Sequence, residues 1–282
     1  MGRALSQLID DIELEKIDIN IFRGTPIDDA RGHVYGGQVL AQAINAAGRT
    51  VARPLVLHSL HAYFLREGEP DLPVIFEVDR IRDGKTYTTR RVVAIQHGRP
   101  IFNVSLSYQV EEAGCIDHQP AMPVVDAPEP LLNDELFYEQ MMGAQLQKGW
   151  PIEYRQLEPV NIHQPEARPG RTSVWLKSQG ELADDLALHQ ELLAYATDHL
   201  LLQTALRPHG KSAWNPAVKM ATLDHALWFH RPFRIDDWLL HEMETVVAYG
   251  GRAFCRGQVF NRAGELVAST AQEGVIREDN EA

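Results

Sequence analysis

Basic residues are scarce in this chain. Its 282 residues include 27 Lys and Arg against 39 Asp and Glu, which gives a formal net charge of −12. Because this excess of negative charge repels a phosphate backbone, we expect no nucleic-acid partner. An anionic ligand would need a local group of Arg or Lys side chains, since the chain as a whole does not attract anions.

Cysteines and long apolar runs are also scarce. The two cysteines, Cys115 and Cys255, stand outside any C-x-x-C motif, which suits a reducing compartment. The most apolar segment, residues 192–206, is interrupted by Asp198 and His199, so we expect no membrane span. Residues 1–11 mix charged and apolar side chains and lack the core of a signal peptide. These features predict a cytoplasmic protein.

Several catalytic motifs are missing. The absence of G-x-S-x-G argues against a serine α/β-hydrolase. The absence of G-x-G-x-x-G and of G-x-x-x-x-G-K-[ST] argues against Rossmann and P-loop nucleotide sites. There is no H-E-x-x-H, and His58 and His61 would face opposite sides of a predicted strand. We therefore expect neither a metal nor a cofactor.

What the sequence does contain is an internal similarity between two halves. Residues 63–66, Tyr-Phe-Leu-Arg, resemble residues 228–231, Trp-Phe-His-Arg, at an offset of 231 − 66 = 165 positions. The same offset pairs Glu77 with Glu242, Arg91 with Arg256, and Ile101-Phe102 with Leu266-Val267. Four matches at one offset indicate a duplication, although chance matches between common residues remain an alternative.

Each half has the same internal order, a helix followed by strands. We predict helices near residues 37–49 and 185–205. We predict strands at 55–66, 74–82, 86–96 and 100–110 in the first half, and at 220–231, 239–249, 253–261 and 266–276 in the second, several of them with clear alternation of apolar and polar residues. One helix followed by antiparallel strands is typical of the α+β class.

The domain prediction follows from this repeat. Residues 1–110 form an N-terminal half, residues 111–153 a linker, and residues 154–282 a C-terminal half. The linker contains prolines at 120, 123, 128 and 130, which disfavour regular structure. A short helical pattern follows at 131–149.

Asp198 is the most informative single residue. On the predicted second helix, the residues one turn away share its face and are apolar: Ala194, Tyr195, Leu201 and Leu202. A carboxylate on an apolar face must be hydrogen-bonded or paired, because burying it alone is unfavourable. Two interpretations stay open: a core Asp satisfied by a backbone amide or a His, or a general base next to water.

Two further polar residues lie in the predicted strands of the second half. Thr222 falls early in one strand and Gln272 falls in another. Composition alone favours an ordinary strand residue in both cases. Asp224 and His225 follow Thr222 directly and are candidates to pair in the same area.

Several stretches together resemble the acyl-CoA thioesterase II family over residues 14–277. In the first half they are Val-Tyr-Gly-Gly-Gln at 34–38, His-Ser-Leu-His-Ala-Tyr-Phe-Leu-Arg at 58–66, Arg-Arg-Val at 90–92 and Ala-Ile-Gln at 94–96. In the second half they are Tyr-Ala-Thr-Asp at 195–198, Asp-His-Ala-Leu-Trp-Phe-His-Arg-Pro-Phe at 224–233, and residues 267–274. The resemblance implies a double hot-dog fold, in which a joined antiparallel sheet wraps two long helices.

The resemblance also implies a catalytic group of an Asp, a Thr or Ser, and a Gln that bind and activate water. The matching positions are Asp198, Thr222 and Gln272. The offset of 165 places Leu57 and Ser107 at the positions of Thr222 and Gln272 in the first half. The group is therefore not duplicated, and we expect one active centre per chain.

Substrate-binding candidates come from the first half. Gly36 and Gly37 open the predicted first helix, where a backbone N–H could bind an oxyanion. A tight turn into the helix explains the two glycines equally well. His58 is a candidate for lining the site, and a hydrogen-bonded strand histidine is the alternative.

The expected activity is hydrolysis of fatty acyl-CoA to free fatty acid and CoA. A hot-dog enoyl-CoA hydratase is one alternative, although adjacent helical residues such as Asp198 and His199 diverge by about 100° and pair poorly. An acyl-CoA-binding protein without activity is the other. The resemblance implies a homodimer or a homotetramer.

Overall fold

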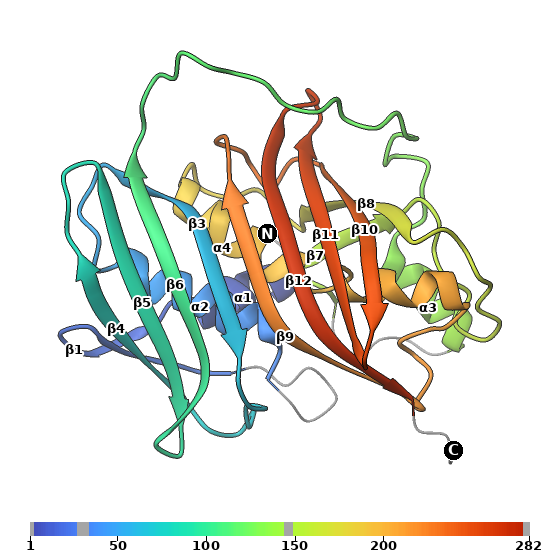
Figure 1. Cartoon of the computed structure of the whole chain (residues 1–282), viewed down its shortest axis with the longest axis horizontal. Coiled ribbons are helices and arrows are strands. Elements are labelled where there is room, and N and C mark those ends of the chain that lie inside the picture. The colour runs from blue at the N-terminus through green and yellow to red at the C-terminus, as the bar shows by residue number, and fades with distance from the viewer. Residues whose placement is uncertain (1–2, 27–33, 144–148, 279–282) are drawn as a thin grey trace.

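The sheet is the frame of the molecule. The computed structural model describes residues 3–26, 34–143 and 149–278. Within them, twelve antiparallel strands form one sheet, in the order β1-β2-β4-β5-β6-β3-β9-β12-β11-β10-β8-β7 (Figure 1). In chain order the strands are β1 (Glu15–Asp18), β2 (Ile21–Gly24), β3 (Leu55–Phe64), β4 (Val74–Arg82), β5 (Tyr87–Gln96), β6 (Arg99–Val110), β7 (Ile152–Gln156), β8 (Arg171–Ser178), β9 (Val218–Phe229), β10 (Leu239–Tyr249), β11 (Arg252–Asn261) and β12 (Leu266–Glu278).

The strand order reads the same from both edges. β3 of the first half corresponds to β9 of the second, β6 to β12, β5 to β11, β4 to β10, and β2 to β8. The two halves join where β3 pairs with β9, and His61 lies opposite Ala226 there. These two residues are 226 − 61 = 165 positions apart, which is the offset found in the sequence. The predicted repeat is therefore present in the sheet.

The eight strands expected from the sequence are all present, within two or three residues of their predicted ends. The alternation that predicted them is also visible in their burial. In β5, Thr88, Arg90, Val92 and Ala94 are buried while the residues between them are more exposed. Four strands, β1, β2, β7 and β8, were not predicted. β7 spans the predicted boundary between residues 153 and 154.

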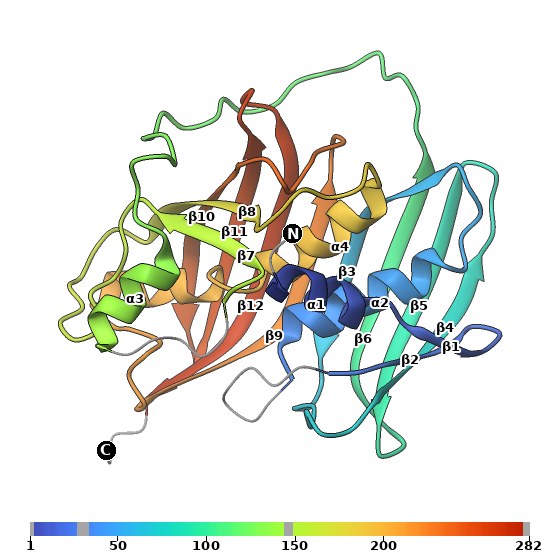
Figure 2. The same cartoon turned by 180° about the vertical axis from the view of Figure 1, so that it is seen from behind.

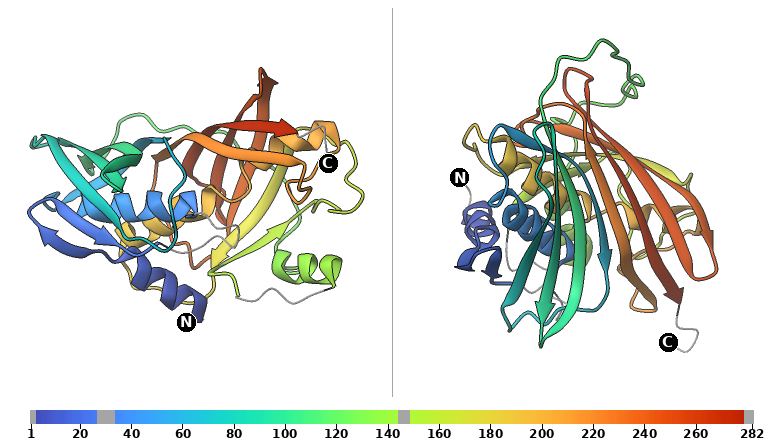
Figure 3. Two further views of the ribbon diagram at one scale, coloured as in Figure 1. Left: turned by 90° about the horizontal axis from the view of Figure 1, so that it is seen from below. Right: turned by 60° about the vertical axis from the view of Figure 1, so that its left-hand side comes forward.

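Helices cover one face of this sheet. They are α1 (Arg3–Ile12), α2 (Gly36–Gly48), α3 (Asp134–Met142) and α4 (Leu186–Thr197), with a 3₁₀ helix, η1 (Leu202–His209). Seen from behind, α1, α2 and α4 lie side by side on that face (Figure 2). The sheet curves around them in the view from below (Figure 3). The α+β expectation is confirmed.

The first predicted helix is confirmed as α2. Ten of its residues are buried, among them Ala41, Ala43, Ala46 and Ala47. Small side chains let the helix approach its neighbours closely. It packs against α4 on one side and against β5 and β6 on the other, which explains why even its glutamines, Gln38 and Gln42, are buried.

The second predicted helix, at 185–205, is wrong in its extent. α4 ends at Thr197, Asp198 is its C-cap residue, and η1 follows as a separate element. The apolar side chains among residues 200–206 are all buried, while Gln203 is partly exposed. A burial pattern does not reveal how the backbone turns, so it fits the 3₁₀ segment as well as an α-helix.

The two halves differ in the elements that pack against their strands. In the second half, η1 is the element that packs against β10 and β11. It belongs to the connection from α4 to β9, residues 198–217, which is much longer than the connection from α2 to β3, residues 49–54. The second half thus differs from the first just after the end of its helix.

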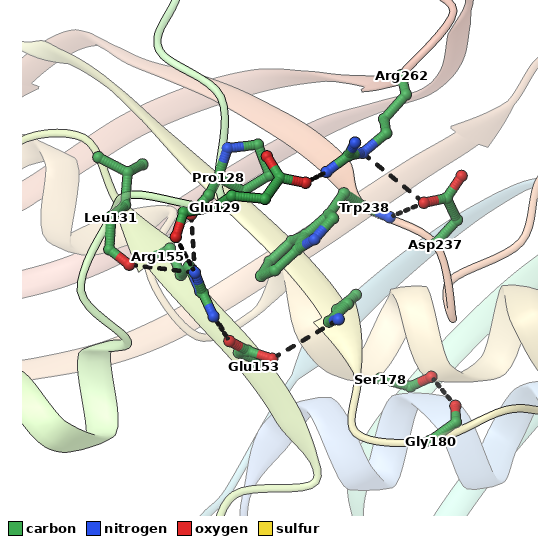
Figure 4. A network of polar contacts seen from close by, with 11 residues as sticks. Pro128, Glu129, Leu131, Glu153, Arg155, Ser178, Gly180, Asp237, Trp238 and Arg262 are labelled. Carbon is green, nitrogen blue, oxygen red and sulfur yellow. Dashed lines mark hydrogen bonds and ion pairs between the residues drawn. The ribbon is translucent and has the colours of Figure 1, made fainter.

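The segment between the halves runs from β6 past the ends of the central strands and is fastened to the second half (Figure 1). Arg155 donates from Nη1 to the carbonyl oxygens of Pro128, Glu129 and Leu131, at 2.8, 3.1 and 3.2 Å (Figure 4). Its guanidinium also lies over the Trp238 ring, with Cζ 5.1 Å from the ring centroid. Arg155 alone therefore donates hydrogen bonds to three backbone carbonyl oxygens of a proline-rich segment that forms no strand.

No helix in the described ranges is both long and apolar enough to cross a membrane.

The junction between β3 and β9 should be the most sensitive part of the fold. Leu60 and Leu227 lie opposite each other there, and both are fully buried. We expect Leu60→Ala to lower the free energy of unfolding by about 2–5 kcal/mol, the usual range for a core leucine. Ile81→Ala, at a position that is 55% exposed, is the control and should change it by less than about 0.5 kcal/mol. Urea unfolding measures both, and equal effects would contradict the assignment.

Candidate active site

Three side chains from three elements meet on the helix-covered side of the second half. Asp198 follows the last residue of α4, Thr222 lies on β9, and Gln272 lies on β12. Gln272 Nε2 donates to Asp198 Oδ1 at 2.8 Å and to Thr222 Oγ1 at 2.8 Å. Thr222 Oγ1 in turn donates to Asp198 Oδ1 at 3.4 Å. The structure thus brings together the three residues proposed as the catalytic group.

A β-bulge places Thr222 on the correct face. Gln272 lies opposite His225 and Glu273 opposite Asp224, but Gly274 then lies opposite Thr222, so Leu223 is the extra residue. In a regular strand, positions 222 and 225 would face opposite sides. The extra residue turns Thr222 to the same side as His225 and Gln272.

The N-terminus of α2 closes the site from the first half. The backbone N–H of Gly37 is close enough to the Asp198 carboxylate to lower its pKa. A Cβ on Gly36 would lie only 2.8 Å from Asp198 Oδ2, and one on Gly37 would lie 2.5 Å from the carbonyl oxygen of Tyr195. The two glycines therefore permit a close approach between the halves that a side chain would block.

These glycines were proposed as substrate-binding residues. The structure places them at the site, with the Gly37 N–H close to the Asp198 carboxylate. Their part in binding substrate stays a prediction.

The surroundings of Asp198 set its protonation. The residue is partly exposed as a whole, but protein surrounds its carboxylate. Burial raises the pKa of Asp198 to about 6, while hydrogen bonds from Gln272, Thr222 and the Gly37 backbone act in the opposite direction. The positive end of the α2 dipole also favours the ionised form. The carboxylate is therefore mostly ionised at neutral pH, and it is a stronger base than an ordinary Asp.

The side-chain oxygen of Gln272 accepts no hydrogen bond from the described part of the chain. Its residue is fully buried, and both amide hydrogens go to Asp198 and Thr222. Oε1 therefore remains a buried acceptor without a donor among the described residues. Buried acceptors of this kind are normally satisfied by water or by a ligand.

Two tyrosines hold the end of α4 beneath Asp198. Tyr35 donates its hydroxyl to the carbonyl oxygen of Tyr195 at 2.9 Å, and Tyr154 donates to that of Ala196 at 3.1 Å. The last carbonyls of a helix lack partners within the helix, so these bonds satisfy them. Burial raises the pKa of both hydroxyls, and the Asp198 charge adds to this. Sequence reasoning missed both roles, although Tyr35 stands next to the glycine pair.

His58 lies in the first half's counterpart of the site. Its Nε2 is 2.8 Å from Ser107 Oγ, and its ring lies edge-on to Tyr87. Burial lowers its pKa. The offset of 272 − 107 = 165 makes Ser107 the counterpart of Gln272, and His58 is the bulged residue of β3 as Leu223 is of β9. The structure does not join His58 to the three residues above, and its lining role stays a prediction.

In the described ranges, no three His, Cys, Asp or Glu side chains are gathered as the ligands of a metal ion would be.

Comparison with known proteins identifies the family. The model of a family described as "Acyl-CoA thioesterase" matches residues 146–275, and that of an "Acyl-CoA thioesterase N-terminal domain" matches residues 25–109. The chain is 39% identical to acyl-CoA thioesterase 2 of Haemophilus influenzae over 98% of its length and 99% of that protein. This chain belongs to the acyl-CoA thioesterase II family. The resemblance noted in the sequence is thereby confirmed.

Two further similarities agree with this membership. The chain is 37% identical to human acyl-coenzyme A thioesterase 8, over 94% of this chain and 87% of the relative. The crystal structure of acyl-CoA thioesterase II TesB2 from Mycobacterium marinum superposes with a TM-score of 0.81 at 36% identity, covering 98% of this chain and 100% of the other. The double hot-dog fold is confirmed.

The glycines of α2 offer a test of the contact between the halves. We expect Gly37→Ala to lower the free energy of unfolding by about 1–3 kcal/mol, because its Cβ would collide with a backbone carbonyl. Gly48→Ala, in the last position of the same helix, meets nothing within 4 Å and is the matched control. It should be neutral or stabilise by up to about 1 kcal/mol. Thermal unfolding distinguishes them, and similar curves would argue against the close approach.

The donors around Asp198 offer a second test. Thr222 lowers the pKa of Asp198 by hydrogen bonding, so Thr222→Val should raise it further above 6. Carboxyl ¹³C chemical shifts, followed between pH 4 and 9, report this pKa directly. Thr172→Val removes a buried hydroxyl that has no partner among the described residues and should leave the Asp198 titration unchanged. An unchanged titration in Thr222→Val would show that the 3.4 Å contact has no influence.

Proposed function

We propose that this protein hydrolyses fatty acyl-CoA thioesters with a water molecule that Asp198 activates as a general base. The observation that supports this most strongly is the polar group around Asp198. A carboxylate whose pKa is raised to about 6 lies within hydrogen-bonding distance of Thr222 and Gln272. Membership of an acyl-CoA thioesterase family supplies the substrate class.

The reaction needs no covalent step on the protein. A thioester carbonyl is electrophilic, and a thiolate is a good leaving group. The water oxygen attacks the carbonyl carbon while its proton passes to Asp198, which gives a tetrahedral intermediate. The C–S bond then breaks, and the proton held by Asp198 passes to the departing CoA sulfur. The products are the free fatty acid and CoA, and the carboxylate of Asp198 is regenerated.

The elevated pKa of Asp198 suits this role. A general base works best when its pKa lies close to the working pH, because it is then both ionised and strongly basic. With a pKa of about 6, Asp198 is ionised at neutral pH and accepts a proton more readily than an ordinary Asp would.

Gln272 and Thr222 orient the attacking water in this scheme. A water molecule has two hydrogens to donate. One points to the Asp198 carboxylate, and the Oε1 atom of Gln272, which lacks a donor among the described residues, accepts the other. Thr222 fixes the Gln272 amide, since its Oγ1 accepts from Gln272 Nε2 at 2.8 Å. The orientation of the amide is thereby set so that Oε1 faces the water.

The thioester carbonyl belongs at the first turn of α2. The backbone of Gly36 lies directly beside the Asp198 carboxylate, since a Cβ on Gly36 would be only 2.8 Å from Asp198 Oδ2. The positive end of the α2 dipole stabilises the negative charge that develops on the carbonyl oxygen. In this arrangement the first half supplies the electrostatic environment and the second half supplies the base.

The hydratase alternative has less support. It would pair an Asp with a His, and His199 is the residue adjacent to Asp198. The His199 ring instead packs against Trp150 and Tyr154, with centroid distances of 5.2 and 4.8 Å. No contact of this ring with Thr222 or Gln272 is seen among the described residues.

Replacing the base is the direct test. Asp198→Asn keeps the shape of the side chain and removes the proton acceptor, so we expect kcat for acyl-CoA hydrolysis to fall by about 10²-fold or more. KM should change little, because the loss affects the transition state more than the bound substrate. Steady-state thiol release measures both constants, with circular dichroism as the folding control.

Asp224→Asn is the matched control, since Asp224 is a half-buried carboxylate of β9 that accepts from the Glu273 N–H at 2.9 Å. It should keep most of the activity. In the wild type, kcat should fall as the pH drops below about 6, because protonation removes the base. A folded Asp198→Asn variant with near-normal kcat would rule out the mechanism.

A further inference from the structure

The last residue of α4 carries a second buried polar contact, which the mechanism above does not use. Thr197, 1% exposed, precedes Asp198, and its Oγ1 lies 3.3 Å from Nε2 of His225, 0% exposed. The same hydroxyl donates to the carbonyl oxygen of Ala194 at 3.3 Å. A threonine hydroxyl has a single hydrogen to donate. With the hydroxyl hydrogen directed to the Ala194 carbonyl, His225 is the donor in its contact with Thr197, which assigns its proton to Nε2.

His225 is a neighbour of all three residues of the site, Asp198, Thr222 and Gln272, although by different routes. It lies directly opposite Gln272 in the pairing of β9 with β12, and it follows Thr222 on the same strand after the bulge. Through Thr197 it reaches the residue adjacent to Asp198. This hydrogen bond ties the end of α4 to β9, in addition to the 3.4 Å contact from Thr222 to Asp198, whereas Tyr35 and Tyr154 tie it to the loop before α2 and to β7.

Two apolar side chains in place of Thr197 and His225 would leave no buried polar atom without a hydrogen bond. The Nδ1 atom of His225 is buried and has no partner among the described residues, which is unfavourable for stability. A buried hydrogen bond nevertheless fixes one orientation of the groups it joins, which apolar contacts do not. Burial also lowers the pKa of His225 to about 4, so the ring stays neutral and Nδ1 stays unprotonated at the pH of the reaction.

We propose that His225 is a positioning residue for the reaction: its Nε2–H, bonded to Thr197, holds the end of α4 against β9 and so keeps the Asp198 carboxylate on Thr222 and Gln272. The inference rests on the proposed role of Asp198 as the base. It assigns no proton transfer to His225. What His225 controls is the distance between groups carried by a helix and by two strands.

A set of substitutions at position 225 shows which of the two ring nitrogens, Nδ1 or Nε2, is needed for activity. The amide nitrogen of Gln reaches the place of Nε2, whereas that of Asn reaches the place of Nδ1. His225→Gln should keep kcat within about threefold of the wild type, and His225→Asn and His225→Leu should lower it by about tenfold or more, with KM changed by less than about threefold in each. Activity in the Asn variant together with its loss in the Gln variant would overturn the proposal.

Substitutions of Thr197, the hydrogen-bond partner of His225, give an independent test. Thr197→Val keeps the shape and removes the acceptor, so it should lower kcat as His225→Leu does, while Thr197→Ser should not. The double variant should be no slower than either single variant, because both remove one interaction. Fully additive losses would contradict it. If His225→Leu fails to fold, as judged by circular dichroism, Thr197→Val and His225→Gln still decide the question.

A histidine elsewhere in the same core is the matched control. His241, 2% exposed, makes the same kind of contact, with Nε2 3.1 Å from Thr270 Oγ1, but it lies on β10 and does not touch the end of α4 in the described structure. His241→Leu should keep kcat within about threefold. An equal loss in His241→Leu and His225→Leu would show that a general disturbance of the core is responsible.

The titration of Asp198 supplies a readout that does not depend on turnover. If the end of α4 moves, the carboxylate loses the donors that lower its pKa. The ¹³C titration of Asp198 should therefore shift to higher pH in His225→Leu and stay in place in His225→Gln. Asp198→Asn is assayed in parallel. Activity in Asp198→Asn would refute the proposed function, whereas an inactive Asp198→Asn beside a fully active His225→Leu would refute only the role of His225.

Discussion

The pairing of β3 with β9 is the constraint on which the rest of the structure depends. It makes one sheet from two halves and sets their relative position to within a single register. Because the register is fixed, the start of α2 from the first half reaches the end of α4 from the second, and Gly37 lies close to the Asp198 carboxylate. A slip of one residue would turn every side chain of one strand to the opposite face and separate these groups.

Sequence patterns predicted most of the elements whose burial is periodic, although the short strand β7, whose burial also alternates, was missed. β5 and α2 are examples, since each has one face or all faces against the core. β1 was missed because all four of its residues are exposed, so it has no alternation to read. The extent of α4 was misjudged because the apolar residues among 200–206 are buried in a 3₁₀ segment as they would be in a helix. The sequence pattern therefore predicts which residues are buried more directly than it predicts the conformation of the backbone.

The same reasoning from the sequence predicted the site only in part. Helical spacing marked Asp198 as a carboxylate among apolar neighbours, but its partners lie 24 and 74 positions away on other elements. Their grouping came from the family resemblance. The bulge at Leu223, which turns Thr222 inward, leaves no signal in composition. The roles of Tyr154 and His225 were likewise invisible, since each depends on a contact with the end of a distant helix.

One consequence of the joined sheet concerns protein concentration. Asp198 and the N-terminus of α2 come from different halves of the chain, so in two separate hot-dog chains their meeting would be a bimolecular event that dilution reverses. Here the intervening residues tether them, and the effective concentration of one half near the other is constant whatever the amount of protein present. The contact between Asp198 and the N-terminus of α2 is therefore not lost when the protein is diluted.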